Sequence, residues 1–495
     1  MTTRADTPIP SLGGIGRVSQ IDTPQSWCMV GFARADITPP VGIYHRMWGA
    51  ALHDRATGIH RPLTATALWL ESFDREQQKV ILGLDHCLLD RNEFDRIRNC
   101  VHLAVGLPAE NVFISMSHTH GSAWMSRSRS HLPGGDLIGP YLDAMGETCA
   151  RIAADAALGA ELATLVYGTA RCSLARHRDF WDAGSKQFVC GFNPEGPSDD
   201  TVVVAKAIAD DSGKTLGTVV NYACHPTTLA WENTLISPDY LGAMREVVEA
   251  NTGAPCLFLQ GASGQLGPLE GFVGDTKVAD RNGRQLGFAA LSGLEALPEP
   301  GTYFEYAGPV VSGAILGTWK HRPFDAQQEA DSRRWQTRDF TVNLQYRMEL
   351  PTEAETRAAL AKWEAEEETA RAANDTTKVS ECRARAEQMT RQLTRLAALP
   401  AGKAYPFKVS VSRLGSALWV FVPGELYQEF QIALRQRFPQ FAMVIATLTN
   451  DWQPGYLPSA ESYGYGIYQE VISAVSPGCL EALIESVCRE IEGMV

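Results

Sequence analysis

The chain has 495 residues, of which 45% are hydrophobic and 20% are charged, and this composition predicts a globular fold with a large core. Its formal net charge of −13 at pH 7 and its pI of about 5.4 argue against nucleic acid or an acidic membrane surface as a partner, because both require a basic surface.

The cysteines and the first residues indicate the compartment. The 11 cysteines are scattered without CxxC pairs, which predicts reduced, mostly buried thiols and no disulfide framework. The segment MTTRADTPIPSLGGIGRVSQ lacks the apolar region of a signal peptide, and no apolar run approaches the roughly 20 residues that span a bilayer. We therefore expect a cytoplasmic protein with no membrane partner and a loosely ordered leader over residues 1–28.

From residue 29 to about residue 330, apolar strand-like runs alternate with helical patterns. The predicted strands are 79–89, 111–117, 215–225 and 254–263, and the predicted helices are 91–105, 141–158, 239–251 and 279–295. Apolar strands between helices are typical of a sheet covered on both faces. The predicted fold class is α/β, with a mixed sheet and helices on both faces.

Residues 331–405 are predicted to form a helical excursion. Thr352 and Glu355 fit a capping box, and apolar residues recur at spacings of three and four between Val379 and Leu396. This seam predicts one arm of an antiparallel helix pair. A solvated excursion without a catalytic role is the favoured interpretation, and a lid or an oligomer contact is the alternative.

The strand pattern returns over residues 406–495, which are predicted to complete the catalytic domain. The run FKVSVSRLGSALWVFVPGE is followed by a helical stretch at 426–438, a strand at 442–451, an aromatic loop at 452–468 and a final helix.

Residues 113–124, FISMSHTHGSAW, place two histidines just after an apolar strand. On an extended backbone, His118 and His120 would face the same way, and strand ends in α/β proteins open into ligand-binding crevices. The same pattern recurs at His225 in NYACHPTTL and at Glu425 in FVPGELYQEF. An apolar strand, a ligand-type residue and a Gly/Pro loop in each case predict a metal site of the zinc type.

Other sites are excluded by missing motifs. The chain has no HExxH sequence, the Gly-rich stretch LQGASGQLGP lacks the GK[ST] of a P-loop, and no GxSxG elbow is present.

Seven ordered motifs carry a resemblance to a known family. They are GFARADITPPVG, GIHRPLTATALWL, SHTHGSAW, NYACHPTTL…LISPDYLG, FLQGASGQLGP, VPGELY and GYLPSAESY. Together they resemble the neutral (non-lysosomal) ceramidase family, and the likeness is to its short bacterial relatives. The resemblance implies a ceramidase-like catalytic domain that holds one zinc ion per chain and cleaves an N-acyl bond with metal-activated water.

The resemblance also implies site residues. His118, His225, Glu425 and Tyr456 correspond to the zinc ligands, and His120 corresponds to the histidine that works beside the metal. An arginine in the segment ARHRDF contributes in the family, and both Arg176 and Arg178 fit that position.

The chain departs from the family in three places. It has Gly267 where ceramidases carry a serine, Gln265 where many bacterial relatives carry an acidic residue, and no immunoglobulin-like domain after the last motif. A membrane lipid is therefore not the expected substrate. Arg127 and Arg129, just past the HTH motif, suggest a small substrate with an anionic group.

Three functions remain open on the sequence. The first is a zinc-dependent hydrolase of a small polar amide, lactone or related acyl compound, with cleavage of a C–N bond favoured. The second is a metal-assisted lyase or isomerase acting on a sugar-like substrate. The third is an inactive metal-binding scaffold. An oligomer is compatible with each of them.

Overall fold

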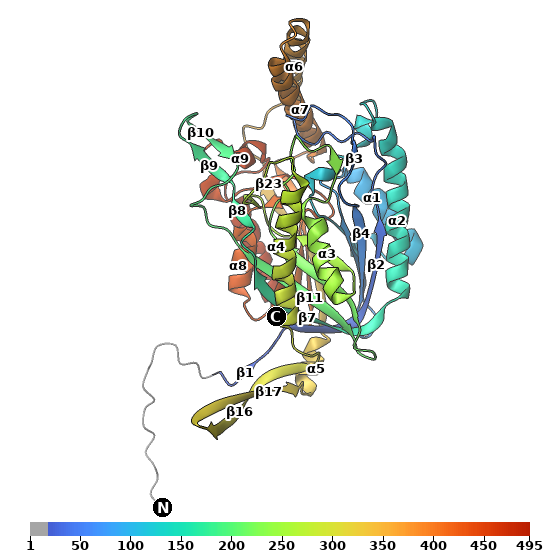
Figure 1. Ribbon diagram of the computed structural model, residues 1–495, viewed down its shortest axis with the longest axis vertical. Helices are drawn as coiled ribbons and strands as arrows, with labels where there is room; N and C mark the ends of the chain where they lie inside the picture. The colour runs from blue at the N-terminus through green and yellow to red at the C-terminus, as the bar shows by residue number, and fades with distance from the viewer. Residues whose placement is uncertain (1–17) are drawn as a thin grey trace, which may run out of the picture.

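The structure, a computed structural model, describes residues 18–495. Most of the expected leader, residues 1–17, lies outside the described residues. Two mixed sheets pack face to face, and helices cover the outer face of each sheet (Figure 1). The predicted α/β class with a mixed sheet is confirmed, and the helices lie on both outer faces of a pair of sheets.

The larger sheet has eight strands in the order β14-β12-β11-β7-β2-β4-β5-β6. The pairs β12–β14 and β5–β6 are parallel, and the other neighbours are antiparallel. The strands are β2 (Gln25–Asp36), β4 (Thr64–Glu71), β5 (Gln78–Leu84), β6 (Val112–Met116), β7 (Glu161–Arg171), β11 (Thr201–Ala209), β12 (Thr215–Tyr222) and β14 (Cys256–Gln260).

The smaller sheet has the order β18-β19-β20-β22, with strands β18 (Trp335–Gln345), β19 (Ala404–Leu414), β20 (Ala417–Phe421) and β22 (Ala442–Ala446). Strand β18 lies inside the range 331–405 that we expected to be helical, so that boundary was wrong. An edge strand with one solvated face has few apolar residues, and only Phe340, Val342 and Leu344 show the alternation of a strand.

Successive side chains of a strand point to opposite faces of the larger sheet and so contact different layers. Leu68 and Leu70 of β4 face the smaller sheet, whereas Trp69 between them faces the helices. Between the sheets, Phe113 stacks on Phe421 with ring centroids 4.2 Å apart. The site therefore stands on two sheets that share one core.

Four helices cover the larger sheet: α1 (Arg91–Val105), α2 (Ile138–Leu158), α3 (Tyr240–Thr252) and α4 (Thr276–Glu295). Helices α8 (Glu429–Arg437) and α10 (Cys479–Glu492) cover the smaller one. The short helices α5 (Ala326–Ser332) and α9 (Tyr468–Ile472) lie in connections. The predicted helices agree with α1 to α4 within a few residues.

Two hairpins project from this body (Figure 1). At one end, β16 (Thr302–Ser312) pairs with β17 (Ala314–Pro323), and β16 also pairs with β1 (Gln20–Ile21). At the other end, α6 (Glu353–Ala372) and α7 (Thr376–Ala398) form the expected antiparallel helix pair, and Thr352 and Glu355 form its capping box.

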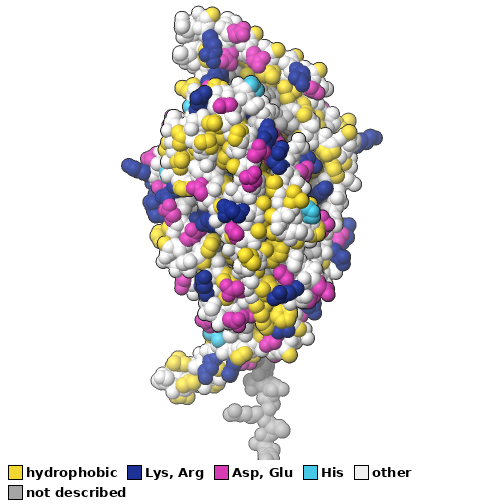
Figure 2. Space-filling view, turned by 90° about the vertical axis from the view of Figure 1, so that its right-hand side faces the viewer, with side chains coloured by type: hydrophobic (Ala, Val, Ile, Leu, Met, Phe, Trp, Pro, Cys, Tyr) yellow, Lys and Arg dark blue, Asp and Glu magenta, His cyan; other side chains and the backbone are white. Residues whose placement is uncertain are grey.

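The surface and the cysteines agree with the composition. Acidic and basic side chains are interspersed over the face seen in Figure 2. All eleven cysteines are free thiols, and nine of them are buried. None of the helices within residues 18–495 combines the length and the apolar character needed to cross a lipid bilayer.

Candidate metal centre

The carboxyl ends of several strands meet at one edge of the two sheets and bring four predicted ligands together. Glu425 Oε2 lies 3.3 Å from His118 Nε2 and 3.0 Å from His225 Nε2. The Tyr456 hydroxyl lies 3.3 Å from the same His225 nitrogen. His118 follows β6, His225 follows β12, and Glu425 follows β20. The three residues that each follow an apolar strand in the sequence thus lie together in one cluster.

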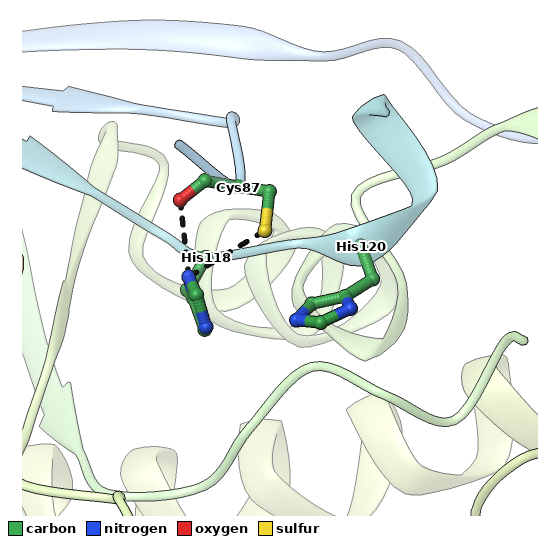
Figure 3. Close-up of side chains that lie close together, drawn as sticks. All are labelled: Cys87, His118 and His120. Carbon is green, nitrogen blue, oxygen red and sulfur yellow. Dashed lines mark hydrogen bonds between the residues drawn. The ribbon is translucent and has the colours of Figure 1, made fainter. Parts of the chain in front are cut away.

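His118 sits where the chain leaves β6, with φ of 66°. Residues other than glycine rarely adopt this left-handed conformation, and it is a form of backbone strain that is common at functional sites. We had assumed an extended backbone through His118, and this assumption was wrong. His120 begins a short 3₁₀ turn, and both rings nevertheless lie on the same side of the segment that joins them (Figure 3).

Backbone carbonyls fix the orientation of both histidines of the candidate site. His118 Nδ1 lies 3.0 Å from the carbonyl oxygen of Cys87 (Figure 3), and His225 Nδ1 lies 2.8 Å from that of Ser263. A carbonyl only accepts, so each Nδ1 carries the proton and donates it. The Nε2 atom of each ring faces Glu425 and is the nitrogen left to bind a metal, as in metal-binding histidines held by an outer hydrogen bond.

Glu425 and Tyr456 are held side by side by a short parallel pair of strands. They face each other in the register of β21 (Glu425–Leu426) and β23 (Tyr456–Leu457). Gly424 precedes them with φ of 73°, and a Cβ there would lie 3.0 Å from the carbonyl oxygen of Gly455. The Pro-Gly turn before Glu425 therefore requires glycine for this close approach.

The donor set fits a cation. Two imidazole lone pairs and a carboxylate oxygen point at one another, and the three residues lie within the span of one metal ion. The buried Nε2 of His118 has no hydrogen-bond partner among the described residues. A positive charge is needed between these groups, either a proton on His118 or a metal ion, and two histidines, a carboxylate and a phenol suit Zn²⁺.

Burial and neighbouring charges shift the pKa values of Glu425, His225 and His118. Burial would raise the pKa of Glu425, but His118 and His225 lower it well below its usual range. Burial and the nearby guanidinium of Arg178 lower the pKa of His225 to about 3. Burial would lower the pKa of His118, but Cys87 and Glu425 raise it well above its usual value. Thus Glu425 is a carboxylate and His225 a neutral imidazole, as metal ligation requires, and a bound metal ion would displace the proton that His118 holds towards Glu425.

His120 lies beside this cluster and not within it. Its ring centroid is 5.0 Å from that of His118, and its plane is turned by 89°. Both ring nitrogens are buried, and neither has a hydrogen-bond partner among the described residues. Burial, and then the nearby His118 and His225, lower its pKa well below the usual value. His120 is therefore a neutral imidazole free to bond a ligand.

The two candidate arginines are placed differently. Arg178 is buried, and its Nη2 donates to the Tyr456 hydroxyl at 3.1 Å and to the carbonyl oxygen of Gly264 at 2.6 Å. Arg176 pairs with Gly267 between β8 (Ala175–His177) and β15 (Leu266–Pro268). Of the described residues that line the cavity next to the site, Arg178 is one and Arg176 is not.

That cavity has a volume of about 430 Å³, within the usual range of roughly 300–1,000 Å³ for small-molecule sites. His120, Arg178 and Tyr456 line it on the side of the metal cluster. Helix α7 also lines it, with Ala384, Glu387, Gln388, Arg391 and Arg395. The helical excursion therefore forms part of the cavity wall, contrary to our favoured interpretation of a solvated segment.

The two arginines that follow the HTH motif, Arg127 and Arg129, are both paired with carboxylates. Arg127 is paired with Glu93 and Asp143. Arg129 is buried, donates to Glu387 Oε1 at 2.8 Å and also bonds the Tyr44 hydroxyl. Their expected role in binding an anion is therefore not supported by the structure.

Glu387 ties α7 to the body through Arg129, so we expect Glu387→Gln to loosen this helix. Removing one partner of a buried ion pair costs about 3 kcal/mol. Burial would raise the pKa of Glu387, but Arg391 and Arg129 lower it to about 2. A lowered carboxyl pKa stabilises the fold above about pH 4.5, and this stabilisation is lost as the pH falls towards 2.

Hydrogen exchange of residues 376–398 measures this prediction. Glu387→Gln should lower the protection of α7 at pH 7, and the difference from the wild type should shrink below about pH 4.5. Glu381→Gln, at an exposed position of the same helix, is the control. Equal protection in both variants at pH 7 would contradict the anchoring role.

Several residues of the site were not predicted from the sequence. The carbonyl groups of Cys87 and Ser263 orient the ligand histidines, and backbone groups carry no residue-type signal. The buried Gln265 accepts from the backbone N–H of Gln428 and donates to Glu429, so it supports the segment after Glu425. The sequence does single out Asp239, as a helix cap or as a residue that orients a ligand; it caps α3 and accepts from the backbone N–H of Leu229, in the loop after His225.

Comparisons with known proteins agree with this architecture. The sequence model described as neutral/alkaline non-lysosomal ceramidase, N-terminal, matches residues 28–257, which include His118 and His225. No match was found among proteins with curated descriptions. A crystal structure of neutral ceramidase from Pseudomonas aeruginosa is similar, with a TM-score of 0.62, 16% identity and coverage of 94% of this chain and 74% of that one. A ceramidase complexed with C2 gives a TM-score of 0.61 with the same identity and coverage. At this identity the two structures show a shared fold.

Proposed function

The chain is a member of the neutral ceramidase-like family, and from this membership we propose that it is a metal-dependent hydrolase that cleaves an amide bond. We propose one zinc ion per chain, held by His118, His225, Glu425 and Tyr456. The proposed substrates are small polar amides, with lactones and related acyl compounds as chemical neighbours. A metal-assisted lyase or an inactive scaffold would carry the same ligands.

One observation carries the proposal. Two oriented imidazole nitrogens lie 3.3 and 3.0 Å from one carboxylate oxygen, and a cavity lined by His120 and Tyr456 lies next to them. Side chains that only stabilise a fold have no need of two oriented imidazoles that share one buried carboxylate beside a cavity.

A bound zinc ion supplies two effects, the polarisation of a carbonyl group and a lower pKa of water. The chain's own residues do the rest. Glu425 and the two histidines set the charge and position of the ion. The neutral His120 can accept a proton from the attacking water and pass it to the leaving nitrogen. Arg178 fixes the Tyr456 hydroxyl through its 3.1 Å hydrogen bond and thereby keeps it beside the other proposed ligands.

Metal removal tests the proposal. We expect chelator-treated protein to lose the release of amine from an amide panel that includes ceramide, and we expect added Zn²⁺ to restore it. Chelated His118→Ala should not recover, because it lacks one imidazole ligand. Release of amine that is unchanged after the metal has been removed would contradict a metal-dependent hydrolase. Turnover without release of an amine or an acid would favour a lyase.

A further inference from the structure

The charges in the cavity indicate the substrate. Building on the proposed hydrolase, we propose that the cavity binds an amide whose amine part carries a carboxylate, an N-acylated amino acid, and that Arg395 of α7 recognises this carboxylate together with Arg391.

Arg395 has no anionic partner. Its guanidinium donates only to the neutral side chain of Gln392, at 3.3 and 2.8 Å. Among residues 18–495, no carboxylate oxygen lies within 4.0 Å of it, whereas Arg391 and Arg129 nearby are both paired with Glu387. The side chain is partly buried at the wall of the cavity. A guanidinium withdrawn from water and left without a counter-ion is a site for one.

The other charges leave the cavity with an excess of positive charge. Of the described residues that line it, three are arginines, Arg178, Arg391 and Arg395, and one, Glu387, carries a carboxylate. Glu387 is shared between Arg391 at 2.7 Å and Arg129 at 2.8 Å, so it does not neutralise the remaining arginines. Arg178 bonds a phenol and a carbonyl and has no carboxylate partner either. An anionic ligand is the partner that this arrangement lacks.

An aromatic surface accounts for the rest of the ligand. Trp48 packs on the His120 ring with centroids 5.0 Å apart, and it also contacts Trp231 and Phe272 at 6.2 and 5.6 Å. All four of these residues line the cavity. An apolar group therefore fits the aromatic wall, the carboxylate fits α7, and the scissile amide lies at His120 and Tyr456.

The reaction balances with water alone. The bond between the acyl carbon and the amide nitrogen breaks, and the oxygen of water forms a bond to the acyl carbon. The nitrogen takes up a proton and leaves as the amine of the amino acid. The products are a carboxylic acid and a free amino acid, and no oxidant or reductant is required.

A matched pair of probes tests the inference. N-acetyl-phenylalanine carries the carboxylate, and N-acetyl-phenylalaninol replaces it with a neutral hydroxymethyl group. We expect the zinc-loaded protein to cleave the acid with a kcat/KM about 10- to 100-fold above that of the alcohol. Arg395→Gln should remove this preference through a higher KM for the acid, and it should change the rate with the alcohol by less than about twofold.

Two further variants separate charge from folding. Arg395→Lys keeps a positive charge but not the planar fork, and it should retain part of the preference. Arg385→Gln replaces an exposed arginine on the same helix and should behave as the wild type. An equal KM for the acid in the wild type and Arg395→Gln would overturn the inference.

Calorimetric binding to chelator-treated protein separates this inference from the proposed function. The interaction between Arg395 and the carboxylate does not need the metal, so the acid should bind more tightly than the alcohol, and Arg395→Gln should abolish the difference. Such binding without hydrolysis would sustain the anion site and count against the hydrolase. Hydrolysis of both probes with no difference in binding would support the hydrolase and contradict the anion site.

Discussion

Glu425→Gln is expected to remove the metal and to reduce amide hydrolysis on the order of 10⁴-fold. Glu425 supplies the only carboxylate oxygen that contacts both His118 and His225 among the described residues. Glutamine has nearly the same shape but no negative charge, so the two imidazoles would face a neutral amide. The cation would then lose the one anionic ligand that offsets its charge. Metal content and the release of amine measure the two effects.

Glu429→Gln is the matched control for this prediction. Glu429 begins α8 four residues further on and accepts a hydrogen bond from Gln265 at 2.7 Å. The same change of charge there should leave both metal content and activity near wild type. A Glu425→Gln protein that keeps a full complement of metal would show that the carboxylate is not a ligand.

His120→Asn is expected to keep the metal and to lower kcat by about 10²- to 10⁴-fold, with little change in KM. His120 lies outside the group of His118, His225 and Glu425, and its two ring nitrogens are unpartnered at the edge of the cavity. Asparagine retains hydrogen-bonding capacity but cannot pass on a proton. The loss should therefore appear in the chemical step and not in binding.

His131→Asn, at an exposed position in the loop after the HTH motif, is the control for His120→Asn. It should leave kcat and metal content unchanged. A full kcat in His120→Asn would contradict proton transfer by His120.

The part of the site that follows strands was accessible from the sequence. An apolar run that ends in His118, His225 or Glu425 indicates a side chain at the edge of a sheet, and parallel neighbours bring such edges together. Because β12 and β14 are parallel, as are β5 and β6 and also β20 and β22, their carboxyl ends converge. The likeness of the motifs added Tyr456, which no strand rule would have selected.

The part built from long-range packing was not accessible. The apolar seam of α7 predicts a helix but not the residues that pack against its other face. Arg391 and Arg395 were therefore not predicted to line the cavity. Arg127 and Arg129 are near the HTH motif in sequence, but ion pairs with Glu93, Asp143 and Glu387 neutralise them. A run of arginines in a sequence predicts an anion-binding site only when it is known that no carboxylate of the same chain pairs with them.

The most direct test is the metal content of the wild type, His118→Ala, His120→Ala and Glu425→Ala, measured by elemental mass spectrometry on protein prepared without chelators. The proposed site predicts about one zinc ion per chain in the wild type and in His120→Ala, and its loss from the other two variants. A wild type that contains no metal and takes up none when zinc is added would contradict the metal centre and leave only a shared fold.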